Sequence, residues 1–122
     1  MSVPPNPLPE LIYHICADSL WQAARQAGVY HGSAQARADG FLHLSTAETL
    51  AGSLAKHYPD PTGFVILTVR LAALRDVDLR WEPSRGGLLF PHIYSDLPLA
   101  AVIAVTPASD GATLAMTEAS TP

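Results

Sequence analysis

Hydrophobic and polar residues alternate in short runs along this chain, the pattern expected of strands whose two faces meet different surroundings. Runs of this kind cover residues 11–16, 41–44, 78–82 and 88–94. Two further runs, 64–71 and 100–106, are apolar at nearly every position. Continuous apolar runs are typical of strands buried on both faces, so we expect a central strand at 64–71 and a last buried strand at 100–106. Pro91 lacks the N–H that a central ladder uses, and it therefore predicts an edge position for 88–94.

Two segments show helical spacing instead. The first begins at the capping residues 18–19 and ends at Gly28, a residue suited to a helix C-terminus. The second begins with the capping-box pattern Ser-Thr-Ala-Glu at 45–48 and continues to about His57. Between the first helix and the second strand, residues 29–38 predict a loop.

The predicted elements do not alternate strand and helix throughout, which favours a mixed α+β fold over a doubly wound sheet. A chain of 122 residues is long enough for one domain with one core. We place this domain at residues 10–107. Residues 1–9 contain four prolines and predict an extended leader, and the small, polar residues 108–122 predict a flexible tail.

Composition and charge narrow the classes of function. A hydrophobic content of 48% and a mean hydropathy of +0.18 exclude a wholly disordered chain. Seven Lys+Arg stand against eleven Asp+Glu, so the chain lacks the basic surplus that extended nucleic-acid binding requires. No run suits a bilayer span or a secretory signal, and the single Cys16 cannot form an intrachain disulfide. We therefore expect a cytoplasmic domain with neither a membrane nor an extended nucleic acid as partner.

Three of the five histidines, His14, His43 and His92, lie in the extended runs. An imidazole among apolar neighbours needs hydrogen-bond partners for both ring nitrogens. Two interpretations follow: three separate histidines bonded to the backbone, or three histidines that converge on one site. A zinc site is disfavoured because the separations of 29 and 49 residues show no short ligand pair. Cys16 shares a face with His14, but side chains two apart on a strand diverge, so we interpret the thiol as a small buried group.

Polar groups at turns supply the other candidates. Ser45 and Thr46 present hydroxyls and free amides at a helix start, which suits an anion and equally suits simple capping. Arg85 beside two glycines is a candidate for a phosphate contact, or else a solvated turn residue. Glu82 is a candidate general acid or base, or a surface partner of a neighbouring arginine.

Taken in order, these residues resemble the bacterial family called domain of unknown function 952. The resemblance extends from Leu11 to Thr106. It is carried by Ile-Tyr-His-Ile at 12–15, Asp-Gly-Phe-Leu-His-Leu-Ser at 39–45, Phe-Pro-His-Ile-Tyr at 90–94, Trp21, Gly28, Tyr30, Trp81, Glu82, Leu97 and Pro98. Two positions depart from the family: Leu44 stands where cysteine is frequent, and Ser95 stands where glycine is usual.

The resemblance implies an ADP-ribosyltransferase-like fold, in which two small mixed or antiparallel sheets hold NAD in a cleft, here with two helices in the N-terminal half. Within that superfamily the RNA 2′-phosphotransferases carry two histidines that His14 and His43 match, the second before Leu44-Ser45. Glu82 or His92 matches the third position. The resemblance thus makes His14, His43, Glu82 and His92 the catalytic candidates.

The same resemblance implies ligand contacts. Tyr13 or Tyr94 would stack on the nicotinamide or adenine ring, and Ser45, Thr46 and Arg85 would meet the pyrophosphate. The expected function is binding of a small nucleotide, with NAD as substrate and ADP-ribosyl transfer as the reaction. Two alternatives stay open: a non-catalytic nucleotide-binding module, and a metal-assisted hydrolase built from the same histidines. The acidic balance disfavours transfer from RNA.

Overall fold

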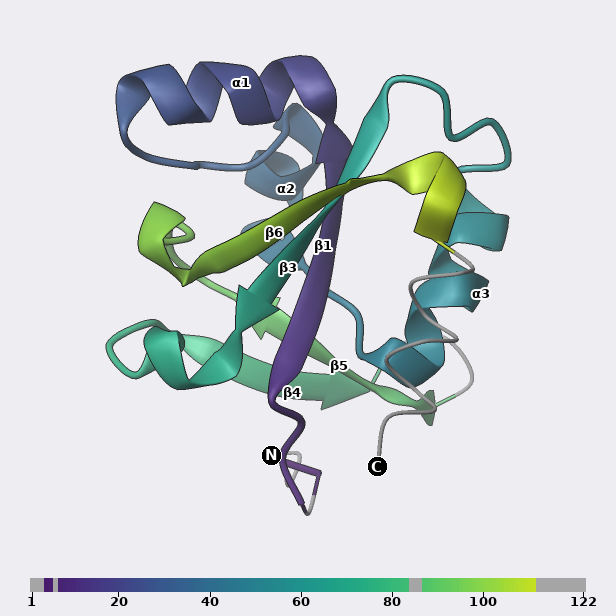
Figure 1. Cartoon of the computed structure of the whole chain (residues 1–122). Coiled ribbons are helices and arrows are strands. Elements are labelled where there is room, and N and C mark those ends of the chain that lie inside the picture. Colours follow the sequence, from purple (N-terminus) through teal and green to yellow (C-terminus); the bar gives the residue numbers. More distant parts are fainter. Residues whose placement is uncertain (1–3, 6, 84–86, 112–122) are drawn as a thin grey trace.

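Two three-stranded antiparallel sheets form the framework of the computed structural model, which describes residues 4–5, 7–83 and 87–111 (Figure 1). The first sheet has the order β1-β3-β6, made of β1 (Leu11–Ala17), β3 (Phe64–Arg70) and β6 (Val102–Pro107). The second has the order β2-β5-β4, made of β2 (Leu42–His43), β5 (Leu89–Ile93) and β4 (Leu79–Pro83). The predicted α+β class is confirmed, with both sheets antiparallel.

Within the described residues, three α-helices accompany the sheets: α1 (Asp18–Ala27), α2 (Ala34–Asp39) and α3 (Ala47–His57). Short 3₁₀ turns occur at η1 (Leu71–Leu74), η3 (Leu99–Ala101) and η4 (Ala108–Asp110). Helices α1 and α3 confirm the two predicted helices. The loop prediction for 29–38 is wrong at its end, because α2 forms there. Ser33 caps α2 through its side chain, and Gly40 ends it with φ 87°. A helix of six residues is too short to show a periodic pattern.

Helix α3 begins one residue later than the predicted capping box. The amide of Thr46 donates to Thr49 Oγ1 at 2.9 Å, so the cap uses Thr46 and Thr49. Ser45 is left for two other contacts. Its backbone pairs with Tyr13, and its hydroxyl lies 3.1 Å from the hydroxyl of Ser53. The cap therefore frees Ser45 to face a neighbouring strand.

Strand β3 lies at the centre of the first sheet, as its continuous hydrophobicity predicts. The edge prediction for 88–94 is wrong, because β5 lies at the centre of the second sheet. Pro91 is tolerated there because β2 ends at His43. The ladder between β2 and β5 therefore stops before it would need a backbone N–H from Pro91. The carbonyl of Pro91 still accepts from the amide of Leu44 at 3.0 Å.

The prediction of a buried last strand is also wrong. Strand β6 lies at the edge of the first sheet, and Ile103 and Val105 are 45% and 44% exposed. An apolar run looks the same in a sequence whether its strand lies at the edge or at the centre of a sheet. Strand β6 lies at the edge because β3 is its one neighbour in the described sheet.

Two clusters of buried side chains lie on opposite faces of the first sheet. Alternation along β1 sends Ile12 and Cys16 into the larger cluster and Tyr13 into the smaller one, as expected for a strand with two buried faces. The larger cluster also holds residues of α1, α2 and the second sheet, namely Trp21, Ala24, Ala36, Leu42, Trp81 and Ile93. The smaller contains residues of α3 and of the 3₁₀ turn η4 that follows β6, namely Leu50, Leu54 and Ala108. Packing thus continues past residue 107 through η4.

A short contact joins the two sheets. The amide of Tyr13 in β1 donates to the carbonyl of Ser45 at 2.8 Å, and the amide of Ser45 donates back at 2.7 Å. This pair brings the middle of β1 beside the end of β2. None of the helices in the described part of the chain has the length and apolarity to span a membrane.

Candidate functional site

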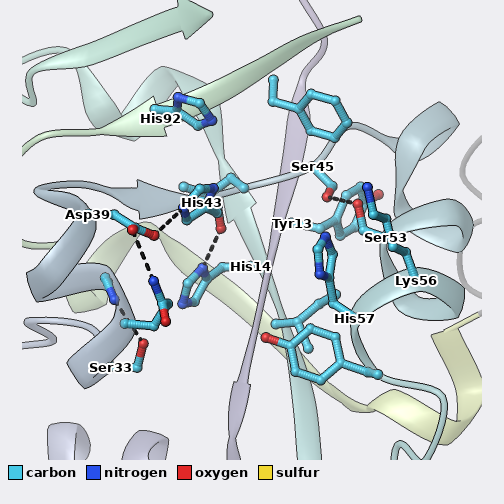
Figure 2. A pocket seen from close by; sticks show the side chains of 16 residues that line it. Tyr13, His14, Ser33, Asp39, His43, Ser45, Ser53, Lys56, His57 and His92 are labelled. Atoms are coloured by element: carbon cyan, nitrogen blue, oxygen red, sulfur yellow. Dashed lines mark hydrogen bonds and ion pairs between the residues drawn. The ribbon is translucent and has the colours of Figure 1, made fainter. Parts of the chain in front are cut away.

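A cleft of about 510 Å³ opens where the two sheets and α3 meet (Figure 2). Figure 2 shows polar side chains on both of its walls: Asp39, His43 and His92 on one, and Ser45, Ser53, Lys56 and His57 on the other. Sites for small molecules measure roughly 300–1,000 Å³, so this cleft has the size of a ligand site.

His14 forms the floor between these walls and is held at both ring nitrogens. Its Nδ1 lies 2.8 Å from the carbonyl oxygen of His43, and its Nε2 lies 2.6 Å from the hydroxyl of Tyr30. A carbonyl can only accept, so Nδ1 carries the hydrogen and Nε2 accepts from the Tyr30 hydroxyl. Burial lowers the pKa of His14 to about 4. His14 is therefore a neutral clamp between β1 and β2.

Cys16 continues this buried network. Its thiol lies close enough to Tyr30 for the two groups to affect each other's pKa, and the hydrogen of the Tyr30 hydroxyl is used by His14. Burial raises the pKa of the Cys16 thiol to about 11, and burial also raises the pKa of Tyr30. A buried thiol with so high a pKa is a poor nucleophile, in agreement with its interpretation as a small buried group.

His43 is held by a carboxylate at the end of α2. Its Nε2 lies 2.8 Å from Asp39 Oδ2, and the side chain of Gln35 donates to Asp39 Oδ1 at 3.0 Å. The hydrogen bond from His43 is the largest cause that lowers the pKa of Asp39 below its ordinary value. With a side chain 53% exposed, His43 stands at the mouth of the cleft, and Asp39 orients its ring.

His92 is held by a second carboxylate. Its Nδ1 lies 2.8 Å from Glu82 Oε1, and the hydroxyl of Tyr94 donates to the same oxygen at 2.6 Å. These bonds, from Tyr94 first and His92 second, lower the pKa of Glu82. Burial is the main cause that lowers the pKa of His92 itself. Arg80 lies over the ring of Tyr94, 4.1 Å from its centroid, and completes the support behind His92.

The two carboxylate-bound histidines face each other. His43 and His92 are direct partners in the β2–β5 register, with ring centroids 5.1 Å apart and planes at 71°. Phe41 stacks on His92 at 4.3 Å and touches the ring of His43 at 4.6 Å. The three histidines named from the sequence thus line one cleft, and His14 reaches His43 through the backbone.

The other predicted site residues are distributed unevenly. Tyr13 and Ser45 line the cleft. Glu82 lies behind His92, and Thr46 is occupied in capping α3. Tyr94 lines a second, shallower hollow together with His31 and Phe41. Arg85 lies outside the described residues, as do 112–122 of the predicted tail.

Sequence reasoning missed the wall supplied by α3. Ser53, Lys56, His57 and Tyr58 all line the cleft, and Lys56 is the single lysine of the chain. Polar residues in the last turn of a helix are common on any surface, so they gave no signal. Asp39 was detectable, because a spacing of four residues from His43 suits a side-chain contact where a short helix ends.

The metal alternative finds no ligand set in the part of the chain that the structure describes. Among those residues, no three His, Cys, Asp or Glu side chains are placed to hold one metal ion. Structural zinc and catalytic metals both need at least three converging protein ligands in most sites.

The fold and the cleft define a small α+β domain with a histidine-lined cleft. The chain matches the family model described as "Protein of unknown function (DUF952)" over residues 15–105, and it belongs to this family. No curated protein matches it.

Two solved structures of one relative are similar to this chain. The crystal structure of protein CC0527 from Caulobacter crescentus is 41% identical, covers 79% of this chain and 83% of that chain, and has a TM-score of 0.74. The solution NMR structure of CC0527 is 37% identical, covers 81% and 84%, and has a TM-score of 0.66.

Proposed function

We propose that the cleft binds a small nucleotide and that NAD is its substrate in an ADP-ribosyltransferase-like domain. The observation that carries this proposal is a cleft of about 510 Å³ whose walls combine imidazoles, paired hydroxyls and the single lysine. Hydroxyls suit ribose, a lysine suits phosphate, and flat rings suit a base or nicotinamide. Two antiparallel sheets that meet beside the cleft also agree with the fold implied by the family resemblance.

In this proposal each contact falls to a particular side chain. Lys56 meets a phosphate from the α3 wall, and the adjacent hydroxyls of Ser45 and Ser53 face the ribose. Tyr13 is 1% exposed, so its ring belongs to the packing and offers no free face. Half-buried Tyr58 takes the place of Tyr13 as the aromatic surface for the base.

His14 does not contact the ligand in this scheme. Both of its ring nitrogens are already used, and a bond to ribose would break a contact to Tyr30 or to the backbone of His43. Loss of a buried hydrogen bond costs about 1–3 kcal/mol. His43, exposed at the mouth of the cleft, takes the role of bonding a ribose hydroxyl, and His14 positions it.

Isothermal titration with NAD, ADP-ribose and AMP tests the binding step. We expect saturable binding that Lys56→Met weakens about tenfold, the loss of roughly one charged hydrogen bond. His31→Ala is the matched control, because His31 pairs with Asp96 outside the cleft and its removal leaves binding unchanged. Absence of heat at millimolar ligand, with folded protein, contradicts the proposal.

A non-catalytic nucleotide-binding module is the second candidate, and one observation favours it. Glu82 Oε1 accepts from both His92 and Tyr94, and the cleft lining does not include this carboxylate. Ribosyl transfer would lack the acidic group that offsets developing positive charge. Chromatography of nicotinamide after incubation with NAD separates the two: release supports the transferase, and binding without release supports the module.

A further inference from the structure

Two carboxylate–histidine pairs meet at the cleft, Asp39–His43 and Glu82–His92. We infer that His92 and His43 act as general base and general acid in the hydrolysis of a phosphoric diester. The inference goes beyond the proposed function, because it names a different reaction, and it rests on the proposed function only for the nucleotide class of the ligand.

In each ring, one nitrogen is hydrogen-bonded to a carboxylate and the other is not. Glu82 accepts from Nδ1 of His92, so Nε2 carries the lone pair of the neutral ring. Asp39 accepts from Nε2 of His43, so Nδ1 is the nitrogen that can deliver a proton. Neither His92 Nε2 nor His43 Nδ1 has a hydrogen-bond partner among the residues that the structure describes.

The two rings are fixed at a separation that suits one reacting group. Their centroids lie 5.1 Å apart on directly paired positions of neighbouring strands. Phe41 stacks on His92 with planes at 26° and limits its rotation. Strands hold two side chains in place more rigidly than loops do, and acid–base catalysis requires such a fixed geometry.

Phosphorus is the centre that suits this pair best. Nicotinamide leaves NAD as a neutral molecule and needs no proton, so ribosyl transfer alone would leave a general acid unused. Acyl transfer through a thiol is disfavoured because Cys16 is buried and burial raises the pKa of its thiol. Exchange of one P–O bond for another uses both a base for the entering oxygen and an acid for the leaving one. Lys56 on the opposite wall offsets the charge of the phosphoryl oxygens.

For a nucleoside 2′,3′-cyclic phosphate the step balances with water as the only co-reactant. Water oxygen forms a bond to phosphorus while His92 Nε2 takes one water proton. The bond from phosphorus to one ribose oxygen breaks, and that oxygen takes the proton from His43 Nδ1. The product is a phosphate monoester, and the two rings exchange their protons with solvent before the next turnover.

The pair predicts a rate that falls in acid as His92 takes a proton. Burial is the main cause that lowers the pKa of His92, with the charge of His43 adding to it, so this acid limb lies below the usual histidine range. Among the described residues, the charged and titratable groups around the pair are Asp39 from α2, Glu82 and Arg80 from β4, Tyr94 after β5, His14 from β1, and Lys56 and His57 from α3.

Hydrolysis of 2′,3′-cyclic AMP and of bis(4-nitrophenyl) phosphate, both in EDTA, tests the inference with the full chain. We expect turnover of both probes, and a loss of kcat of about 100-fold or more in His43→Ala and in His92→Gln. His31→Ala retains the wild-type rate. Glu82→Gln moves the acid limb of the pH profile to lower pH, because the hydrogen bond and charge of Glu82 raise the pKa of His92, and a purely structural role would not produce this shift. Circular dichroism confirms that each variant is folded.

The outcomes separate this inference from the proposed function. Turnover of bis(4-nitrophenyl) phosphate without nucleotide binding supports the acid–base pair and overturns the nucleotide proposal. Nucleotide binding without hydrolysis of either probe overturns the acid–base pair and leaves the proposed function standing. Hydrolysis that survives in His43→Ala or His92→Gln also overturns the pair.

Discussion

His14 is expected to make the fold sensitive to mild acid. Its side chain is buried, and the neutral ring accepts the hydrogen of Tyr30 at Nε2. A proton at Nε2 removes that acceptor and places a charge in the core. Burial is the dominant cause of the low pKa of His14, about 4 against an ordinary 6.5.

The sign of the effect follows from proton binding. Between pH 6.5 and about 4 the unfolded chain binds a proton at His14 and the folded chain does not. The free energy of unfolding therefore falls as pH is lowered through this window. A pKa of about 4 in place of 6.5 corresponds to about 3 kcal/mol over the full window, and to about 2 kcal/mol between pH 7.5 and pH 5.

Urea unfolding at a series of pH values between 7.5 and 5 measures this contribution, with fluorescence of the buried Trp21 and Trp81 as the signal. His14→Gln cannot titrate, so we expect the wild-type chain to lose about 2 kcal/mol more than this variant. His31→Gln, at a site 52% exposed, is the matched substitution control. Equal slopes for wild type and His14→Gln would refute the assignment of a buried, neutral His14.

Two other predictions concern a glycine and the cysteine. Gly32 has φ 91°, and a Cβ there would lie 2.4 Å from Leu42 Cδ2, whereas Gly28 has φ 82° and open space. In thermal unfolding experiments, Gly32→Ala should lower the free energy of unfolding by about 2–4 kcal/mol, and Gly28→Ala should lower it by about 1 kcal/mol. Equal losses would contradict the overlap at Gly32. Cys16 should react with Ellman's reagent at pH 8 at least about 100-fold more slowly in the folded chain than in urea, because its pKa is about 11 instead of 9.0. Equal rates would show that the thiol is not buried.

Much of the fold follows from local patterns. Alternation along β1 places Ile12 and Tyr13 on opposite faces, and a continuous apolar run marks β3 as the central strand. These predictions succeed because each depends on neighbours within one element. Strand β6 and Pro91 were misjudged because an edge or a centre is decided by partners distant in the chain.

The candidate site divides in the same way. The histidines stood out in the sequence because a titratable ring in an apolar run needs partners wherever it lies. Lys56 did not stand out, because only the packing of α3 brings the last turn of that helix to the cleft.

The amino-acid sequence alone determined the family, the α+β class and the three histidines that line the cleft. The tertiary structure alone decided what each histidine does. His14, locked by Tyr30 and a carbonyl, became a neutral clamp, while His43 and His92 each received a carboxylate and kept one nitrogen available. The physical reason is that proton affinity and hydrogen-bond partners depend on burial and on atoms contributed by other elements, which spacing along a chain does not encode.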